Sequence, residues 1–164
     1  MDPQAIRIGA KLELCLFELG DTRYGVPLSA VQEFVRMPAL TPLPNAPVVI
    51  PGVINLRGRA VPVVDLRTRF QLKVKEAELS DYLLVVHTAN RVVGLWVDHA
   101  IGTCEVPAEW VTDASSLIEN SGYISGVGKL PDGLVLIHDL TRLLAESERD
   151  SLDSALAATE QDLS

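Results

Sequence analysis

The sequence has no surplus of positive charge. It contains 14 lysine and arginine residues against 22 aspartate and glutamate residues, which gives a formal net charge of -8 at pH 7. Binding to a phosphate backbone depends on clustered basic residues that displace counterions. We therefore expect no nucleic-acid partner.

The sequence also lacks an apolar run of the roughly 20 residues needed to span a bilayer. Met1–Arg7 lacks the cationic stretch and apolar run of a signal peptide. We expect a cytoplasmic protein that does not insert into a membrane. The two cysteines, Cys15 and Cys104, lie far apart in apolar runs. This pattern favours buried thiols in a reducing compartment over a disulfide framework or a metal site.

Groups that could carry catalysis are few and scattered. Asp98 and His99 are neighbours, but adjacent residues of a strand point to opposite faces, so we expect a solvated pair at a strand end. Gly126–Lys129 resembles part of a phosphate loop, yet Leu130 stands where the loop requires serine or threonine. The three histidines are isolated: His87, His99 and His138. We expect no catalytic residues, no metal and no cofactor.

Aromatic residues are scarce at 5%, whereas hydrophobic residues make up 48% of the chain and include many valines and leucines. β-Branched side chains fit the half-buried surface of a sheet better than the turn of a helix. The composition therefore predicts a mainly β protein. Its 164 residues are enough for one domain or for two small lobes.

The chain contains two ungapped internal matches. Residues 15–26 match residues 84–95, which lie 69 positions later, and both read as strand, polar turn, strand. Residues 52–66 match residues 126–140, which lie 74 positions later, and both end in a short helix. Short apolar strands separated by Gly, Asn, Asp and Pro signals are typical of small barrels or sandwiches. The repeat predicts two similar β-lobes.

An aspartate closes the last strand of each repeat. Asp65 precedes Leu66–Phe70, and Asp139 precedes Leu140–Leu144. A side-chain oxygen at this position can accept hydrogen bonds from the free amides of a helical first turn. A catalytic carboxylate pair would require the two residues to lie close together, whereas the repeat assigns them to different lobes. We therefore expect helix caps.

Three segments interrupt or follow the repeats. Five prolines within residues 38–51 exclude a central strand or a helix interior and predict an extended connector. Before it, Ser29–Gln32 fits a capping box, which predicts one helical turn leading into a strand over Glu33–Met37. At the far end, residues 143–156 have loose helical periodicity, and we expect a helical or frayed tail over residues 148–164.

Four segments together resemble the CheW family: Tyr24–Val26, Val31–Glu33, Pro51–Arg67 and Arg91–Asp98. The resemblance covers roughly Leu12–Leu144. Its most specific part is the run Gly-Val-Ile-Asn-Leu-Arg-Gly, which begins at Gly52.

The resemblance implies two five-stranded SH3-like barrels that share a hydrophobic core, within a single domain over residues 12–147. It also implies a non-enzymatic adaptor of chemotaxis signalling. Its partners would be the cytoplasmic tip of methyl-accepting chemoreceptors and the regulatory domain of a CheA-type histidine kinase, within membrane-associated receptor arrays. The alternative is an adaptor of a parallel system that controls surface motility, development or a second messenger. A ligand-binding barrel or a hydrolase would require converging polar groups in a pocket, and the sequence does not suggest such a set.

By the resemblance, Glu33 and Arg57 lie at the receptor-binding groove and matter to signalling. The repeat places Gly102 and Pro131 at the corresponding positions, so a similar lobe can be built without either charge. A plain surface ion pair is the structural alternative. The resemblance also assigns five further residues to the receptor-facing surface: Val31, Gly52, Tyr82, Leu83 and Gly94. For the apolar ones, core packing is an equal alternative. Leu40 on the connector is the single candidate for kinase contact.

Overall fold

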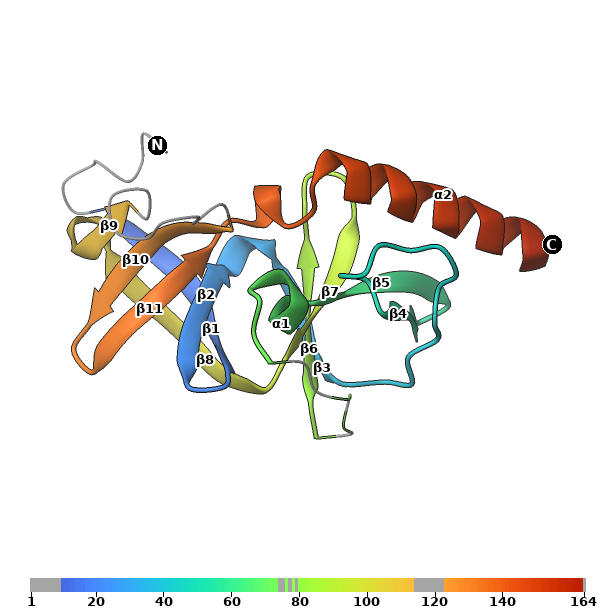
Figure 1. Cartoon of the computed structure of the whole chain (residues 1–164). Helices are drawn as coiled ribbons and strands as arrows, with labels where there is room; N and C mark the ends of the chain where they lie inside the picture. The colour runs from blue at the N-terminus through green and yellow to red at the C-terminus, as the bar shows by residue number, and fades with distance from the viewer. Residues whose placement is uncertain (1–9, 74–75, 77, 79, 114–122, 164) are drawn as a thin grey trace. The chain divides into compact units, whose positions relative to one another are not determined.

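The computed structural model describes residues 10–73, 76, 78, 80–113 and 123–163. These residues form two compact units, each built from two separate stretches of chain. The first unit contains the described residues within 10–31 and 98–142, and the second contains the described residues within 32–97 and 143–163. Each unit is organised around one sheet (Figure 1), so the prediction of a mainly β chain with two lobes is confirmed.

The first unit holds a six-stranded sheet in the order β8-β1-β2-β11-β10-β9. Its strands are β1 (Lys11–Leu19), β2 (Thr22–Pro27), β8 (His99–Pro107), β9 (Val111–Asp113), β10 (Ile124–Leu130) and β11 (Gly133–His138). Neighbouring strands are antiparallel except for β2 and β11, which are parallel. The edge strand β9 comprises three described residues.

The second unit holds a five-stranded sheet in the order β3-β6-β7-β5-β4. Its strands are β3 (Val31–Arg36), β4 (Gly52–Leu56), β5 (Arg59–Asp65), β6 (Tyr82–His87) and β7 (Val92–Val97). The pair β5 and β7 is parallel, as β2 and β11 are in the other sheet.

The sequence repeat reappears in the strand register. In the first sheet Gly25 lies opposite Ile137, and in the second sheet Gly94 lies opposite Val63. Gly25 and Gly94 are repeat partners, and so are Val63 and Ile137, so the two sheets use the same register. Each sheet combines one hairpin from the first half of the chain with one from the second half. The lobes are therefore not consecutive halves of the chain, because each sheet pairs a hairpin of the first half with one of the second half.

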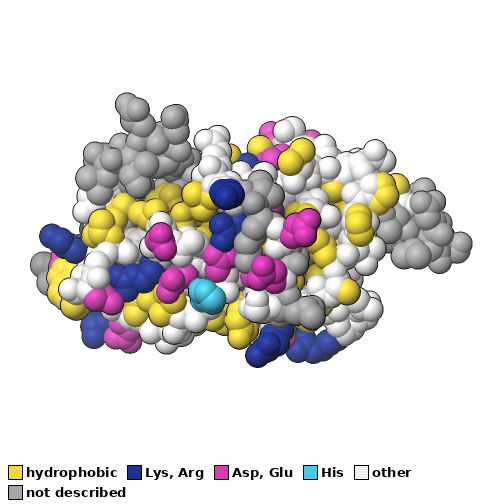
Figure 2. Space-filling view, turned by 60° about the horizontal axis from the view of Figure 1, so that its bottom comes forward, with side chains coloured by type: hydrophobic (Ala, Val, Ile, Leu, Met, Phe, Trp, Pro, Cys, Tyr) yellow, Lys and Arg dark blue, Asp and Glu magenta, His cyan; other side chains and the backbone are white. Residues whose placement is uncertain are grey.

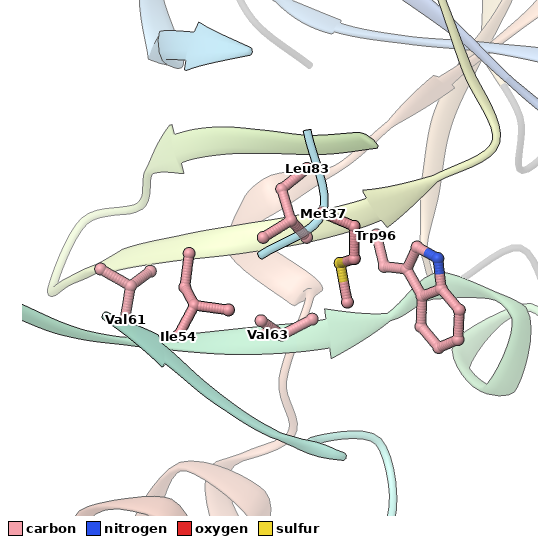
Figure 3. Close-up of a cluster of buried hydrophobic side chains, with 6 residues drawn as sticks. All are labelled: Met37, Ile54, Val61, Val63, Leu83 and Trp96. Atoms are coloured by element: carbon pink, nitrogen blue, oxygen red, sulfur yellow. The ribbon is translucent and has the colours of Figure 1, made fainter. Parts of the chain in front are cut away.

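Each sheet has its own cluster of buried apolar side chains. The cluster of the first unit contains Leu14, Leu16, Val106, Val135 and Ile137. The cluster of the second unit contains Met37, Ile54, Val61, Val63, Leu83 and Trp96 (Figure 3). The Trp96 indole N–H donates to the buried carboxylate of Asp81 at 3.0 Å, so this polar group is satisfied inside the unit. The core that was expected to be shared between the lobes stays a prediction.

Both predicted aspartate caps are confirmed. Asp65 is the N-cap of α1 (Leu66–Arg69), and its Oδ1 accepts from the Arg67 amide at 3.0 Å. Asp139 precedes a 3₁₀ turn, η5 (Leu140–Arg142), and accepts from the Thr141 amide at 3.0 Å. Each carboxylate is thus occupied by its own helical turn, as capping requires.

The predicted capping box is wrong. The helical turn is a short 3₁₀ turn, η2 (Leu28–Ala30), whose N-cap is Pro27 and which has no side-chain cap hydrogen bond. Gln32 lies in β3, which begins at Val31 rather than at Glu33. The box fails because the turn has only three residues and ends at Ala30. The β-branched Val31 already begins the extended β3, so Gln32 is not part of a first helical turn as a capping box requires.

The proline-rich connector of residues 38–51 contains no strand apart from one isolated bridge between Thr41 and Val53. The last element, α2 (Glu146–Leu163), has Leu152 and Ala155 buried along one side. Glu148 accepts from Arg69 at 2.5 Å, and Asp153 pairs with Arg91. The boundary expected between residues 147 and 148 falls inside this helix, and Ser164 lies outside the described residues.

Candidate functional site

The geometry of the second unit brings Glu33 and Arg57 together. Glu33 lies on β3, at one edge of the five-stranded sheet, and Arg57 lies in the turn after β4, at the other edge. Arg57 Nη1 donates to Glu33 Oε2 and Arg57 Nη2 donates to Glu33 Oε1, both at 2.7 Å. This is the bidentate arrangement in which a guanidinium matches a carboxylate most closely. The pair therefore joins the two edges of one sheet.

The backbone at Arg57 is unusual. Its φ is 53°, and the φ of Gly58 is 83°, so two successive residues are left-handed. Such a two-residue turn suits the twist of a hairpin but favours Asn-Gly or Gly-Gly, because an L side chain in this region clashes with its own backbone. The left-handed backbone therefore does not account for the choice of arginine at position 57. The hydrogen bonds of its side chain to Glu33 do account for it.

The ion pair shifts the protonation of both partners. The hydrogen bond from Arg57 lowers the pKa of the Glu33 carboxyl, with loss of hydration acting against it. The same bond raises the pKa of Arg57. The Arg57 side chain is 71% exposed and that of Glu33 25% exposed. The pair thus presents an ionised guanidinium to solvent and holds its carboxylate close to the sheet.

Apolar side chains lie beside the pair. Val35 follows Glu33 by two positions on β3 and therefore shares its face, and Leu56 directly precedes Arg57. Both are half-buried and pack against the cluster of the second unit. The candidate site is therefore an ion pair at the rim of an apolar cluster.

The other predicted receptor-facing residues have different environments. Val31 and Tyr82 are half-buried, and the Arg36 guanidinium carbon lies 5.9 Å from the centre of the Tyr82 ring, within cation–π range. Leu83 and Gly94 are buried in adjacent strands, β6 and β7. Leu83 belongs to the core cluster, and a Cβ on Gly94 would lie 3.4 Å from Leu83 Cδ1.

Gly52 and Leu40 belong to the contact between β4 and the connector. A Cβ on Gly52 would lie 2.3 Å from the carbonyl oxygen of Thr41. The Thr41 and Val53 backbones exchange hydrogen bonds of 2.9 and 2.8 Å, which holds the connector against β4. Leu40 is half-buried against the cluster of the second unit. Close backbone approach explains the glycine at position 52.

The repeat positions of the pair lie where the sequence predicts. Gly102, which corresponds to Glu33, lies on β8, and β8 is next to β1 just as β3 is next to β6. Pro131, which corresponds to Arg57, lies in the β10–β11 turn, and Arg57 lies in the equivalent β4–β5 turn. Proline fixes φ near -65°, so the two turns differ in backbone as well as in side chain. The first unit thus carries no such ion pair at these two positions.

The remaining chemical candidates have structural roles. Asp98 Oδ2 accepts from the Gly20 amide at 2.8 Å, in the turn between β1 and β2, so this carboxylate supports a turn. Gly126–Lys129 lies within β10 and is a strand rather than a phosphate-binding loop. Within the described residues, no cluster of three or more histidine, cysteine, aspartate or glutamate residues could hold a metal ion.

Three further properties concern the surface, the helices and the cysteines. On the face shown in Figure 2, acidic and basic side chains are interspersed with apolar ones. Among the helices that the structure describes, none is long and apolar enough to cross a membrane. Burial raises the pKa of both thiols, Cys15 and Cys104, which are free.

The family model of the CheW-like domain matches residues 13–148. The chain belongs to the CheW-like domain family. It is 31% identical over 144 residues to "Chemotaxis protein CheW" of Klebsiella aerogenes, covering 87% of each chain. It is 40% identical over 97 residues to "Protein FrzA" of Myxococcus xanthus, covering 58% of this chain and 59% of FrzA.

A solved structure agrees with the family assignment. The crystal structure of scaffolding protein TtCheW from Thermoanaerobacter tengcongensis matches with a TM-score of 0.77 at 25% identity, covering 84% of this chain and 94% of that one. The match to TtCheW confirms the expected mainly β fold with two lobes, although the first sheet has six strands rather than the expected five. Family members are adaptor or scaffold proteins, so the expectation of a non-enzymatic protein is also confirmed.

Sequence reasoning missed two features of the site. The first is the cation–π contact between Arg36 and Tyr82, which joins β3 to β6. No sequence signal pairs these residues, because they lie 46 positions apart. The second is Asn55, whose Oδ1 accepts from the Gly58 amide at 2.8 Å. Asparagine close to a glycine-containing turn is a usable sequence signal for such a bond.

Proposed function

We propose that this chain couples methyl-accepting chemoreceptors to a CheA-type histidine kinase. It would act in the cytoplasm and be recruited to membrane-associated receptor arrays. The family match over residues 13–148 carries this proposal. The resemblance of the fold to a protein named as a scaffold supports it.

We propose the Glu33–Arg57 pair as the centre of the receptor-binding surface. The exposed guanidinium offers hydrogen-bond donors beside half-buried apolar side chains, a combination that suits the polar rim and apolar centre of a protein interface. Val31 and Tyr82 would extend this surface. The buried positions Gly52, Leu83 and Gly94 would act by shaping the lobe, because buried atoms are not offered to a partner.

The kinase contact is proposed on the connector at Leu40. A partner would complete the burial of the half-buried Leu40 side chain. The hydrogen bonds of Thr41 hold the neighbouring backbone in place. The kinase partner would be the CheA regulatory domain. An interface of modest size would give an affinity of about micromolar, so calorimetry at high concentration is the suitable measurement. The absence of heat with the cognate kinase would count against this contact.

The receptor surface is tested by Glu33→Ala, Arg57→Ala and Arg57→Glu. Because the pair is exposed, each variant should melt close to the parent, while receptor-coupled kinase activity should fall most in Arg57→Glu, where like charges meet. Lys11→Ala is the matched control, since it removes an exposed ion pair with Glu105 in the other unit. Normal activity of folded Arg57→Glu in receptor arrays would rule out the pair as a signalling element.

A second candidate is an adaptor of a parallel chemosensory system that controls surface motility, development or a second messenger. The 40% identity to FrzA over 97 residues supports this second candidate. Identification of the kinase that co-purifies with the chain separates the two, because the pathway follows from the kinase rather than from the adaptor fold.

A further inference from the structure

The turn that carries Arg57 depends on support from outside its two residues. Arg57 and Gly58 connect β4 to β5, and the flanking residues Leu56 and Arg59 are paired. Glycine adopts the left-handed conformation without penalty, whereas arginine does not. A turn with arginine in the first position therefore requires a stabilising contact to hold its backbone in one state.

Asn55 supplies such a contact. Its Oδ1 accepts a 2.8 Å hydrogen bond from the Gly58 amide, three residues along the chain. The side chain is exposed, so it adds little apolar burial to the fold. Its hydrogen bond instead fixes the amide plane next to Arg57, whose guanidinium reaches Glu33 through two bonds.

The matching hairpin of the other unit provides a natural comparison. Lys129 and Pro131 of β10–β11 correspond to Asn55 and Arg57 of β4–β5. A lysine ammonium cannot accept a hydrogen bond, and proline cannot adopt the left-handed conformation. The asparagine acceptor and the left-handed arginine therefore occur together in one hairpin and are both missing from the other.

We propose that Asn55 is a positioning residue, whose side-chain amide holds the turn in the conformation that presents Arg57 to Glu33. This inference rests on the proposed role of the ion pair in receptor coupling and names the residue that sets its geometry.

The test compares Asn55→Ala, which removes the acceptor, with Asn55→Asp, which keeps an acceptor oxygen, in the full chain. Lys129→Ala is the matched control at the same position of the other hairpin. The readouts are the melting temperature, hydrogen exchange of the Gly58 amide, the pKa of the Glu33 carboxyl by NMR, and receptor-coupled kinase activity. The first three need neither receptor nor kinase, so they report on positioning alone.

We expect Asn55→Ala to melt close to the parent, to exchange the Gly58 amide faster, and to raise the Glu33 pKa towards its value in Arg57→Ala. Its kinase coupling should fall, and Asn55→Asp should restore protection of the Gly58 amide. An unchanged Glu33 pKa in Asn55→Ala, or a large loss of melting temperature, would overturn the inference. A shifted pKa with normal kinase coupling would support the positioning role and contradict the proposed role of the pair.

Discussion

Single residues in this chain show whether a position serves the fold or the surface. Arg57 accepts an unfavourable backbone conformation and makes its contacts through an exposed side chain. Gly52 has the opposite character, because any side chain there would collide with the Thr41 carbonyl. Both residues belong to the most specific motif of the sequence, and only the structure separates their roles.

The first prediction at this scale concerns the acidity of Glu33. Arg57→Ala removes the hydrogen bond that lowers the Glu33 pKa, so this pKa should rise towards its ordinary value. A carboxyl whose folded pKa is lowered contributes stability above its unfolded pKa and loses it as the pH falls through the folded pKa. Any stability difference between parent and variant should therefore shrink in acid. NMR titration of Glu33 measures the shift, and equal pKa values in both proteins would contradict the pair in solution.

The second prediction compares two buried glycines. Gly52→Ala places a Cβ 2.3 Å from a backbone oxygen and should lower the free energy of unfolding by about 1–3 kcal/mol or more. Gly94→Ala is the control, because its Cβ would meet Leu83 at an ordinary 3.4 Å, and its effect should stay within about 1 kcal/mol. Urea unfolding of both variants checks this. Equal effects would show that the connector yields to the added methyl group.

At the scale of elements, strand pairing and helix docking decide what the sequence pattern leaves open. Strands β1 and β8 pair with Leu14 opposite Cys104 and Cys15 opposite Thr103. The two cysteines are therefore neighbours in the sheet but point to opposite faces, which agrees with two free thiols. Helix α2 is attached to its unit by the burial of Leu152 and Ala155 and by ion pairs with Arg69 and Arg91.

The third prediction tests whether α2 is an integral part of its unit. Leu152 is fully buried, so Leu152→Ala should lower the free energy of unfolding by about 2–5 kcal/mol. Ser154→Ala, on the exposed side of the same helix, should change it by less than about 0.5 kcal/mol. Chemical denaturation with a helix-sensitive probe makes the comparison. Similar values for the two variants would mean that the helix behaves as a frayed tail.

At the scale of the whole molecule, the family assignment indicates an adaptor or scaffold protein rather than an enzyme. The carboxylates Asp65, Asp139 and Asp98 each accept hydrogen bonds from nearby backbone amides. Burial raises the pKa of both thiols, which reduces the thiolate needed for nucleophilic attack.

The fourth prediction follows from the family assignment and from the structural roles of these described carboxylates and thiols. The purified chain should turn over neither ATP nor a phosphoprotein, measured by phosphate release over hours at high protein concentration. A variant such as Asp139→Ala should leave the background unchanged, because that carboxylate caps a helical turn. Phosphate release that scales with the concentration of the pure chain would contradict the adaptor assignment.

The sequence by itself determined the properties that depend on near neighbours in the chain. The polar turns and the aspartate caps follow from residues within a few positions of one another, and the β-rich composition and the internal repeat can be read from the sequence without knowing which segments are in contact. The family resemblance followed from the contiguous segment Pro51–Arg67, which contains the motif Gly52–Gly58, together with three shorter matches.

The tertiary structure alone decided which distant segments meet. In the structure, each sheet contains hairpins from both halves of the chain, and a short 3₁₀ turn precedes β3 where a capping box was expected. Glu33 also lies within hydrogen-bonding distance of Arg57. Local preferences differ little in energy, so the burial of apolar faces and the pairing of sheet edges choose among them. Those contacts join residues that are far apart in the sequence, and local patterns therefore do not reveal them.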